Sequence, residues 1–109
     1  RLARPIGFHY SVIMIRFEWD PAKARTNLRK HGVSFDEARS VFFDESALEF
    51  DDPAHSSDER RFLLLGRSVL FRTLVVCHCF RESDEVIRLI SARRATPKEE
   101  DVYERRGRR

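Results

Sequence analysis

The chain has 109 residues, 41% of them hydrophobic and nine of them Phe, so it can form one domain with a packed core but not two. No apolar run approaches the ~18 residues of a membrane-spanning helix, which argues against a transmembrane protein. Cys77 and Cys79 are one residue apart, a spacing that suits neither a disulfide nor a zinc site. We therefore expect a reducing, cytoplasmic location and no metal or other cofactor.

The net charge of +3 is distributed unevenly along the chain. Residues 34–59 carry nine acids and one cation, whereas residues 60–109 carry thirteen cations and seven acids. A fold that brings the basic segments together would attract phosphate, and most of these cations are Arg, which binds phosphate in a bidentate manner. This pattern favours a nucleic-acid partner; ordinary solvated surface charge is the alternative.

The two ends of the chain differ from the middle. Residues 1–13 show neither helical nor strand periodicity until Ser11, so we predict a non-essential N-terminal extension. The working domain is expected at 14–104, beginning at Met14. Residues 105–109 are predicted to form a basic tail.

The first half of the domain predicts a strand followed by two helices. An apolar strand at 15–19 precedes Asp20-Pro21, a typical N-cap with proline in the first turn, and the helix should end at Gly32. Ser34 and Glu37 have the spacing of a capping box and open the second helix. The two helices should form a hairpin around Gly32.

The second half predicts four strands and a terminal helix. Thr96-Pro97 begins that helix, which has only Val102 and Tyr103 as apolar anchors and should dock weakly. The resulting order is β-α-α-β-β-β-β-α, an α+β domain with an antiparallel sheet and helices packed on one face. The four strands are predicted at 47–51, 60–65 (ended by Gly66), 70–80 and 86–93.

Pairing of the last two strands places the candidate reactive groups. With a four-residue loop, His78 lies opposite Leu89 and shares its face with Arg93, whereas Arg81 and Arg88 fall on the other face or at the rim. A one-residue slip in register would exchange these sets.

The chemistry available to these residues is limited. There is no Gly-rich phosphate loop, no carboxylate cluster with metal-ligand spacing and no Ser in a nucleophile motif. Metal-free cleavage of RNA is the reaction that these residues could still catalyse. RNA supplies its own 2′-hydroxyl as nucleophile, and the reaction then needs only proton transfer and cations at the phosphate.

Four runs of sequence resemble the BrnT family of bacterial toxins, and the resemblance covers residues 15–104. They are FEWDPAKARTNLRKHGVSFDEA, VFFDESALEFDDPAHSSDERRFLLLGRS, LVVCHCFRE and IRLISARRATPKEEDVYE. The resemblance implies a RelE-like fold and a ribonuclease that arrests translation. It also implies neutralisation by a BrnA-like antitoxin with a ribbon-helix-helix DNA-binding part, in a complex that represses its own operon and contains a toxin homodimer within a heterotetramer.

Carried over residue by residue, the family pattern marks a set of candidate positions and one departure. Where the family often has Glu-Arg in the last helix, this chain has Glu99-Glu100, which places an acid near the expected phosphate-binding face. The matching positions are Trp19, Lys23, His31, His55, Glu59, Arg60, Arg67, His78, Arg81, Arg93 and Tyr103.

We interpret the chain as a metal-free endoribonuclease toxin whose site has a phosphate clamp, additional positive charge, a proton-transfer group and a stacking or proton-donating group. The phosphate clamp is Arg93 with Arg81, and Arg67 or Arg60 adds positive charge. His78 transfers protons, with His55 as the alternative, and Tyr103 stacks on a base or donates a proton. The residues predicted to bind RNA around them are Lys23, Arg60 and Arg88. The competing interpretation is a non-catalytic toxin homologue that acts as antitoxin partner and co-regulator of transcription.

Overall fold

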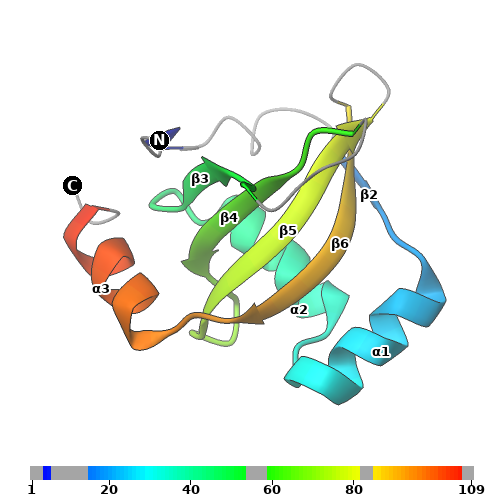
Figure 1. The fold of residues 1–109 in the computed structure, drawn as a ribbon, viewed down its shortest axis with the longest axis horizontal. Helices are drawn as coiled ribbons and strands as arrows, with labels where there is room; N and C mark the ends of the chain where they lie inside the picture. The colour runs from blue at the N-terminus through cyan, green and yellow to red at the C-terminus, as the bar shows by residue number, and fades with distance from the viewer. Residues whose placement is uncertain (1–3, 6–14, 54–58, 82–84, 107–109) are drawn as a thin grey trace.

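The computed structural model describes residues 4–5, 15–53, 59–81 and 85–106. Within these ranges a six-stranded sheet has the order β1-β3-β4-β5-β6-β2, and helices flank it (Figure 1). No helix in these ranges is long and apolar enough to cross a membrane. The elements are β1 (Arg4–Pro5), β2 (Arg16–Glu18), α1 (Pro21–His31), α2 (Phe35–Ser40), the 3₁₀ helix η2 (Val41–Phe43), β3 (Leu48–Asp51), β4 (Phe62–Arg67), β5 (Thr73–Arg81), β6 (Val86–Arg94) and α3 (Pro97–Arg106).

Both helices of the predicted hairpin form where their caps indicate. The Asp20 side chain accepts a 2.8 Å hydrogen bond from the Ala22 amide, and α1 ends at Gly32, which has a positive φ of 69°. The Ser34 hydroxyl accepts a 3.0 Å bond from the Glu37 amide at the start of α2. The α+β class and the element order are confirmed.

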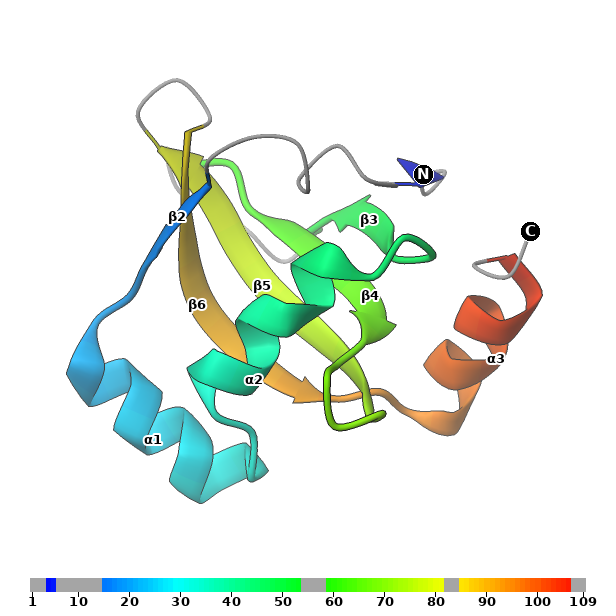
Figure 2. The same cartoon turned by 180° about the vertical axis from the view of Figure 1, so that it is seen from behind.

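The main core lies between these helices and one face of the sheet, which Figure 2 shows from the helical side. The apolar stripe of α2 and η2 is buried, as the helical periodicity predicts. Its members are Phe35, Ala38, Val41 and Phe42, and they pack against Leu64, Leu74, Val76, Ile87 and Leu89 of the sheet.

The sheet is mixed rather than wholly antiparallel, which corrects the prediction. β2 pairs in parallel with β6, with Phe17 opposite Ile87, at the sheet edge far from β3. The other strand pairs are antiparallel. β2 therefore adds three residues at the edge opposite β1, and the chain then crosses the helical face before it forms β3 to β6.

Strand β4 continues through Gly66 to Arg67, whereas the sequence predicts that Gly66 ends it. A Cβ atom at Gly66 would lie 2.8 Å from Val41 Cγ1 and 2.9 Å from the Ala47 Cβ. The glycine is therefore explained by the close approach of η2 and its following turn to the strand.

The register of β5 and β6 confirms the predicted pair of His78 with Leu89 and corrects the predicted face of Arg93. His78 faces Leu89, as expected, but Cys77 faces Ser91, so Ile90 is an extra residue in β6. From Ser91 onward, the bulge therefore exchanges the two faces of the sheet to which successive β6 side chains point. Arg93 pairs with Val75 and lies on the opposite face of the sheet from His78.

Helix α3 packs on the face opposite α1 and α2, so the prediction that helices cover only one face is wrong. Val102 and Tyr103 pack against Leu65 and Val75, in a second, smaller core. The Tyr103 hydroxyl also donates a 2.8 Å hydrogen bond to Asp44 Oδ2, so docking does not depend on apolar contact alone. α3 continues to Arg106, which makes the first two residues of the predicted basic tail helical.

Contacts at the two edges of the sheet involve short segments. At one edge β1 pairs with β3, with Arg4 opposite Glu49, so part of the predicted extension touches the domain; residues 1–3 and 6–14 lie outside the description. At the other edge the buried Asn27 side chain donates to the Val33 and Ala92 carbonyls, at 2.9 and 2.8 Å. The Ala92 amide donates back to Asn27 Oδ1 at 3.0 Å.

Candidate active site

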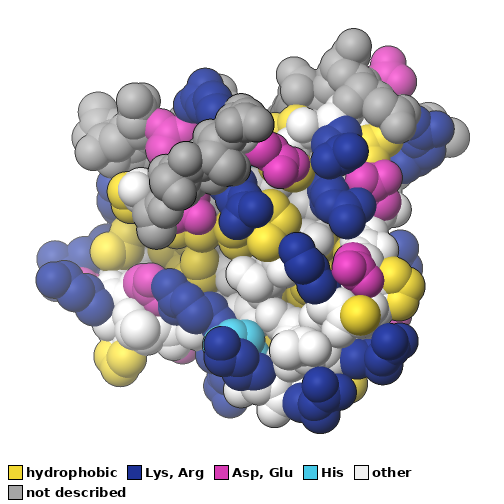
Figure 3. Space-filling model, turned by 45° about the vertical axis from the view of Figure 1, so that its right-hand side comes forward, with side chains coloured by type: hydrophobic (Ala, Val, Ile, Leu, Met, Phe, Trp, Pro, Cys, Tyr) yellow, Lys and Arg dark blue, Asp and Glu magenta, His cyan; other side chains and the backbone are white. Residues whose placement is uncertain are grey.

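The face of the sheet that carries Leu63, Leu65 and Val75, here called the open face, is the one that α1 and α2 leave uncovered. Alternation along β5 places Cys77, Cys79 and Arg81 on it as well. Figure 3 shows Lys and Arg side chains spread over this side of the molecule, with acidic side chains among them and hydrophobic atoms between them.

Three arginines gather at one end of the open face: Arg61, Arg81 and Arg88, here called the arginine cluster. Arg81 Nε lies 3.3 Å from Glu18 Oε2, and Arg88 Nη1 donates to the same oxygen at 2.9 Å. Arg81 Nη1 also lies 3.6 Å from Glu59 Oε2. Residues from three separate parts of the sheet thus converge on two partly exposed carboxylates.

Glu59 is held at the centre of this cluster by a thiol. Cys79 Sγ donates to Glu59 Oε2 at 2.6 Å, and this bond is the main cause that lowers the pKa of Glu59. Burial opposes the effect of this bond without cancelling it, and the charge of each arginine in the cluster adds a smaller lowering of the Glu59 pKa. Burial and the Glu59 carboxylate raise the pKa of Cys79 to about 11, so Cys79 stays a thiol and is no nucleophile at neutral pH.

Arg61, rather than Arg60, belongs to the cluster. Arg60 lies over the Phe62 ring and pairs with Asp51 at 2.7 Å, with its side chain 72% exposed. Arg61 points away from this pair and lines the open face; its Nε atom is buried and makes no hydrogen bond within the part of the chain described. Arg61 was not among the residues predicted from sequence, although the alternation of a strand beginning at Phe62 could have separated the two neighbours.

His78 does not lie on any surface that RNA could reach. It is fully buried among Phe42, Phe62 and Phe80, with ring centroids 4.8, 6.0 and 5.4 Å away. Burial lowers its pKa to about 4, against a smaller opposing hydrogen bond to the Val76 carbonyl. The predicted role of His78 in proton transfer therefore does not fit the structure, because the imidazole is neutral and inaccessible.

The remaining predicted clamp residues lie near α3, at the other end of the strands. Arg93 forms a bidentate pair with Glu99, at 2.8 and 2.9 Å, which lowers the pKa of Glu99 to about 2. Because Arg93 pairs with Val75, six residues along β5 separate it from Arg81, or ~20 Å at ~3.3 Å per residue. One phosphate cannot contact both, so the predicted clamp of Arg93 with Arg81 is wrong.

Arg67 and Tyr103 are also committed to holding α3. Arg67 Nη2 donates to Glu104 at 2.8 Å and its guanidinium lies 5.1 Å from the centre of the Tyr103 ring. Tyr103 is buried, and burial together with its bond to Asp44 raises its pKa well above the usual range. The geometry therefore does not suit Tyr103 to stacking on a base or to donating a proton.

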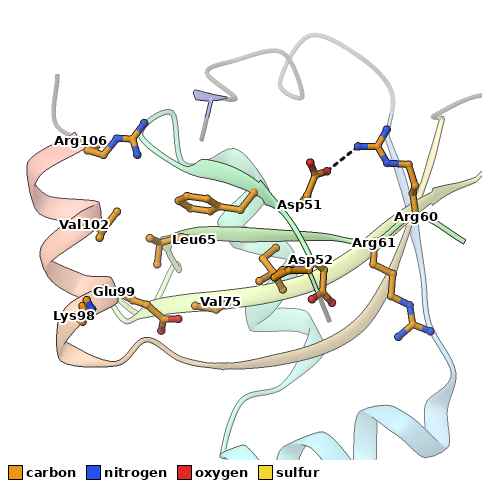
Figure 4. Close-up of a pocket in the computed structure, with 13 residues that line it drawn as sticks. Asp51, Asp52, Arg60, Arg61, Leu65, Val75, Lys98, Glu99, Val102 and Arg106 are labelled. Atoms are coloured by element: carbon orange, nitrogen blue, oxygen red, sulfur yellow. Dashed lines mark hydrogen bonds and ion pairs between the residues drawn. The ribbon is translucent and has the colours of Figure 1, made fainter. Parts of the chain in front are cut away.

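A groove of about 1090 Å³ extends from Arg61 to α3 across the open face (Figure 4). Its floor is apolar, and Arg61 stands at one end with Val102 of α3 at the other. The floor residues are Phe50, Leu63, Leu65 and Val75.

Other predicted positions lie away from this site. Lys23 and His31 line a pocket of about 290 Å³ between α1 and β6, and Trp19 packs edge-on against Phe35. His55 lies outside the residues described, and Glu100 is exposed on α3. Among the residues that the structure describes, no group of three His, Cys, Asp or Glu side chains is placed to hold a metal ion.

Comparison with known proteins gives a family and a fold. A family described as the ribonuclease toxin BrnT of type II toxin-antitoxin systems matches residues 19–99. The fold is similar to the crystal structure of the Brucella abortus ribonuclease toxin BrnT, at 24% sequence identity and a TM-score of 0.56. That match covers 75% of this chain and 97% of the Brucella chain. No curated protein matches significantly.

Proposed function

Because the chain belongs to the BrnT family of ribonuclease toxins of type II toxin-antitoxin systems, we propose that it is a metal-independent endoribonuclease whose site is the arginine cluster. The observation that carries this proposal is the convergence of Arg81 and Arg88 on the Glu18 carboxylate, beside Glu59. Cleavage of RNA at this site would arrest translation.

The arrangement suits attack by the 2′-hydroxyl on the neighbouring phosphate. Glu59, deprotonated at neutral pH, would accept the hydroxyl proton, and its Cys79 bond would fix the carboxylate in place. Arg81 and Arg88 would exchange Glu18 for the phosphate oxygens and stabilise the charge that builds up in the transition state. The 2′-oxygen forms a bond to phosphorus as the bond to the 5′-oxygen breaks, and water protonates the leaving oxygen. No metal is needed in this scheme, since the arginines supply the positive charge.

The test is cleavage of a single-stranded RNA in excess chelator by the full chain and its variants. Arg81→Ala and Arg88→Ala should each lower the rate ~10²-fold, the usual effect of removing one transition-state donor. Arg60→Ala is the matched control, because Arg60 is next to the cluster but faces Asp51. Cleavage that requires added magnesium, or equal effects of the three variants, would contradict the proposal.

The partner proposed from the resemblance is a BrnA-like antitoxin with a ribbon-helix-helix DNA-binding part. Family membership supports a protein antitoxin. A complex with two toxin copies would appear on co-expression with the polypeptide encoded beside this chain, as a heterotetramer in light scattering.

A non-catalytic co-regulator is the second candidate, and one observation favours it. Arg81 and Arg88 already form ion pairs with Glu18, and no imidazole stands beside them within the ranges described. Growth after expression without the antitoxin separates the two: arrest supports the ribonuclease, and normal growth with intact antitoxin binding supports the co-regulator.

A further inference from the structure

The turn between β4 and β5 exposes three successive apolar side chains. Val69, Leu70 and Phe71 are 67%, 62% and 83% exposed, and we call them the apolar tip. Contiguous exposed apolar side chains commonly mark sites of protein association. Neither the arginine cluster nor the groove uses them.

The backbone of the tip is strained at its most exposed residue. Phe71 has φ of 62°, the left-handed region that disfavours residues with a Cβ, and no other non-glycine residue in the described ranges has a positive φ. The Phe71 amide donates to the Ser68 carbonyl at 2.9 Å, and the Ser68 amide donates to the Arg72 carbonyl at 2.8 Å. This is a three-residue hairpin loop, in which glycine normally takes the left-handed position.

The strained loop is rigidly held from below. The buried Ser68 hydroxyl donates to Glu37 Oε2 at 2.7 Å and accepts bonds from the Leu70 and Arg72 amides. Arg72 donates to both carboxylate oxygens of Glu37. The Val69 amide donates to the Ser40 hydroxyl at 2.9 Å. α2 thus fixes the loop in one conformation with its apolar side chains pointing outward.

A bulky side chain in a glycine position, exposed and preorganised, lowers the stability of the free protein without any packing gain. We infer that the apolar tip is an anchor that inserts into an apolar pocket of the antitoxin; this inference rests on the proposed function. Exposed aromatic side chains held in place are suited to this use, since little freedom is lost on binding.

The properties of the tip favour a protein over the other possible occupants. Residues 68–71 carry no cation, the Arg72 guanidinium is bound to Glu37, and β5 separates the tip from Arg81 by ~26 Å, so the tip itself offers no positive charge to an RNA phosphate. A second copy of the chain is disfavoured because three side chains supply only a fraction of the ~800 Å² per partner of a standard interface. The tip fits as one anchor within a larger heterologous interface.

The experiment measures the affinity of full-length variants for the polypeptide encoded beside this chain, together with melting temperature. Phe71→Gly removes the ring and the strain, whereas Phe71→Ala removes the ring and keeps the strain. Both should weaken binding at least tenfold, and the melting temperature of Phe71→Gly should exceed that of Phe71→Ala by a few degrees. Leu28→Gln is the control, because Leu28 is also an exposed apolar residue, on α1.

The binding measurements either support or overturn the role of the apolar tip as an anchor. Binding by Phe71→Gly and Phe71→Ala within twofold of the wild type would overturn it, while a wild type that binds nothing would overturn the toxin–antitoxin proposal as well. If Phe71→Gly is unstable, Val69→Ser with Leu70→Ser tests the same surface without touching the strained position. RNA cleavage by every variant should equal that of the wild type. A wild-type dimer that Phe71→Gly dissociates would assign the tip to self-association instead.

Discussion

Replacement of His78 by Phe should remove most of the acid sensitivity that the buried imidazole gives to folding. His78 lies among three Phe rings with no exposed surface, so a fourth Phe is an acceptable substitute in size and polarity. The variant lacks the titrating group, and its stability therefore reports every other pH effect in the protein.

The magnitude follows from the two pKa values of His78. The folded value is about 4, and an unfolded chain has about 6.5. Below pH 6.5 the unfolded chain binds a proton that the folded protein does not bind, so stability decreases as pH falls. At pH 7 the imidazole is neutral in the folded protein and mostly neutral in the unfolded chain, so it contributes little pH dependence there. Between pH 7 and pH 4 the wild type should lose about 3 kcal/mol of unfolding free energy relative to His78→Phe.

The assay is urea unfolding at several pH values between 4 and 7.5 for the wild type, His78→Phe and His78→Gln. The unfolding free energy of the wild type, minus that of either variant, should fall steadily as the pH decreases below 6.5. A difference that is independent of pH would refute the reasoning. A wild type that gains stability on acidification would show that Glu49, whose Oε1 lies 4.0 Å from His78 Nε2, holds a charged imidazole.

Three further predictions test the packing and the ends of the domain. Gly66→Ala should lower the unfolding free energy in urea by about 1–3 kcal/mol, because the new Cβ overlaps Val41; an unchanged value would mean that η2 moves away freely. Arg93→Ala should cost less than ~1 kcal/mol of stability, since its pair with Glu99 is partly exposed, and should leave RNA cleavage within severalfold of wild type; a hundredfold loss would return Arg93 to the active site. Removal of residues 1–13 should shift the melting temperature by only a few degrees, because β1 adds two residues to the sheet; a drop above 10 °C in calorimetry would make the extension structural.

The local structure could be predicted from sequence because its signals are local. Asp20 and Ser34 accept bonds from amides two and three residues away, and Thr96 and Glu99 cap each other reciprocally. Such contacts require no knowledge of the rest of the chain. The helices and the order of the elements along the chain followed from them and from the change in apolar periodicity.

The candidate site could not be predicted to the same degree, because it depends on contacts between distant segments. The extra residue at Ile90 leaves no mark in the apolar pattern, yet it moves Arg93 to the other face from His78. The side that Arg60 and Arg61 occupy depends on where β4 begins, a boundary that sequence places only within a few residues. The burial of His78 depends on Phe42, which arrives from a helix.

The contacts of Asn27 have a consequence for how the protein behaves at high concentration. A sheet ends in strands whose outward amides and carbonyls can pair with a strand from another molecule, which is a common route to aggregation. Here the outward amide and carbonyl of Ala92 in β6 are both bonded to the Asn27 side chain. The first three residues of β6 pair with β2. A single amide side chain on α1 thus closes the stretch of edge that the short β2 leaves open, and Asn27→Ala would expose it to pairing between molecules.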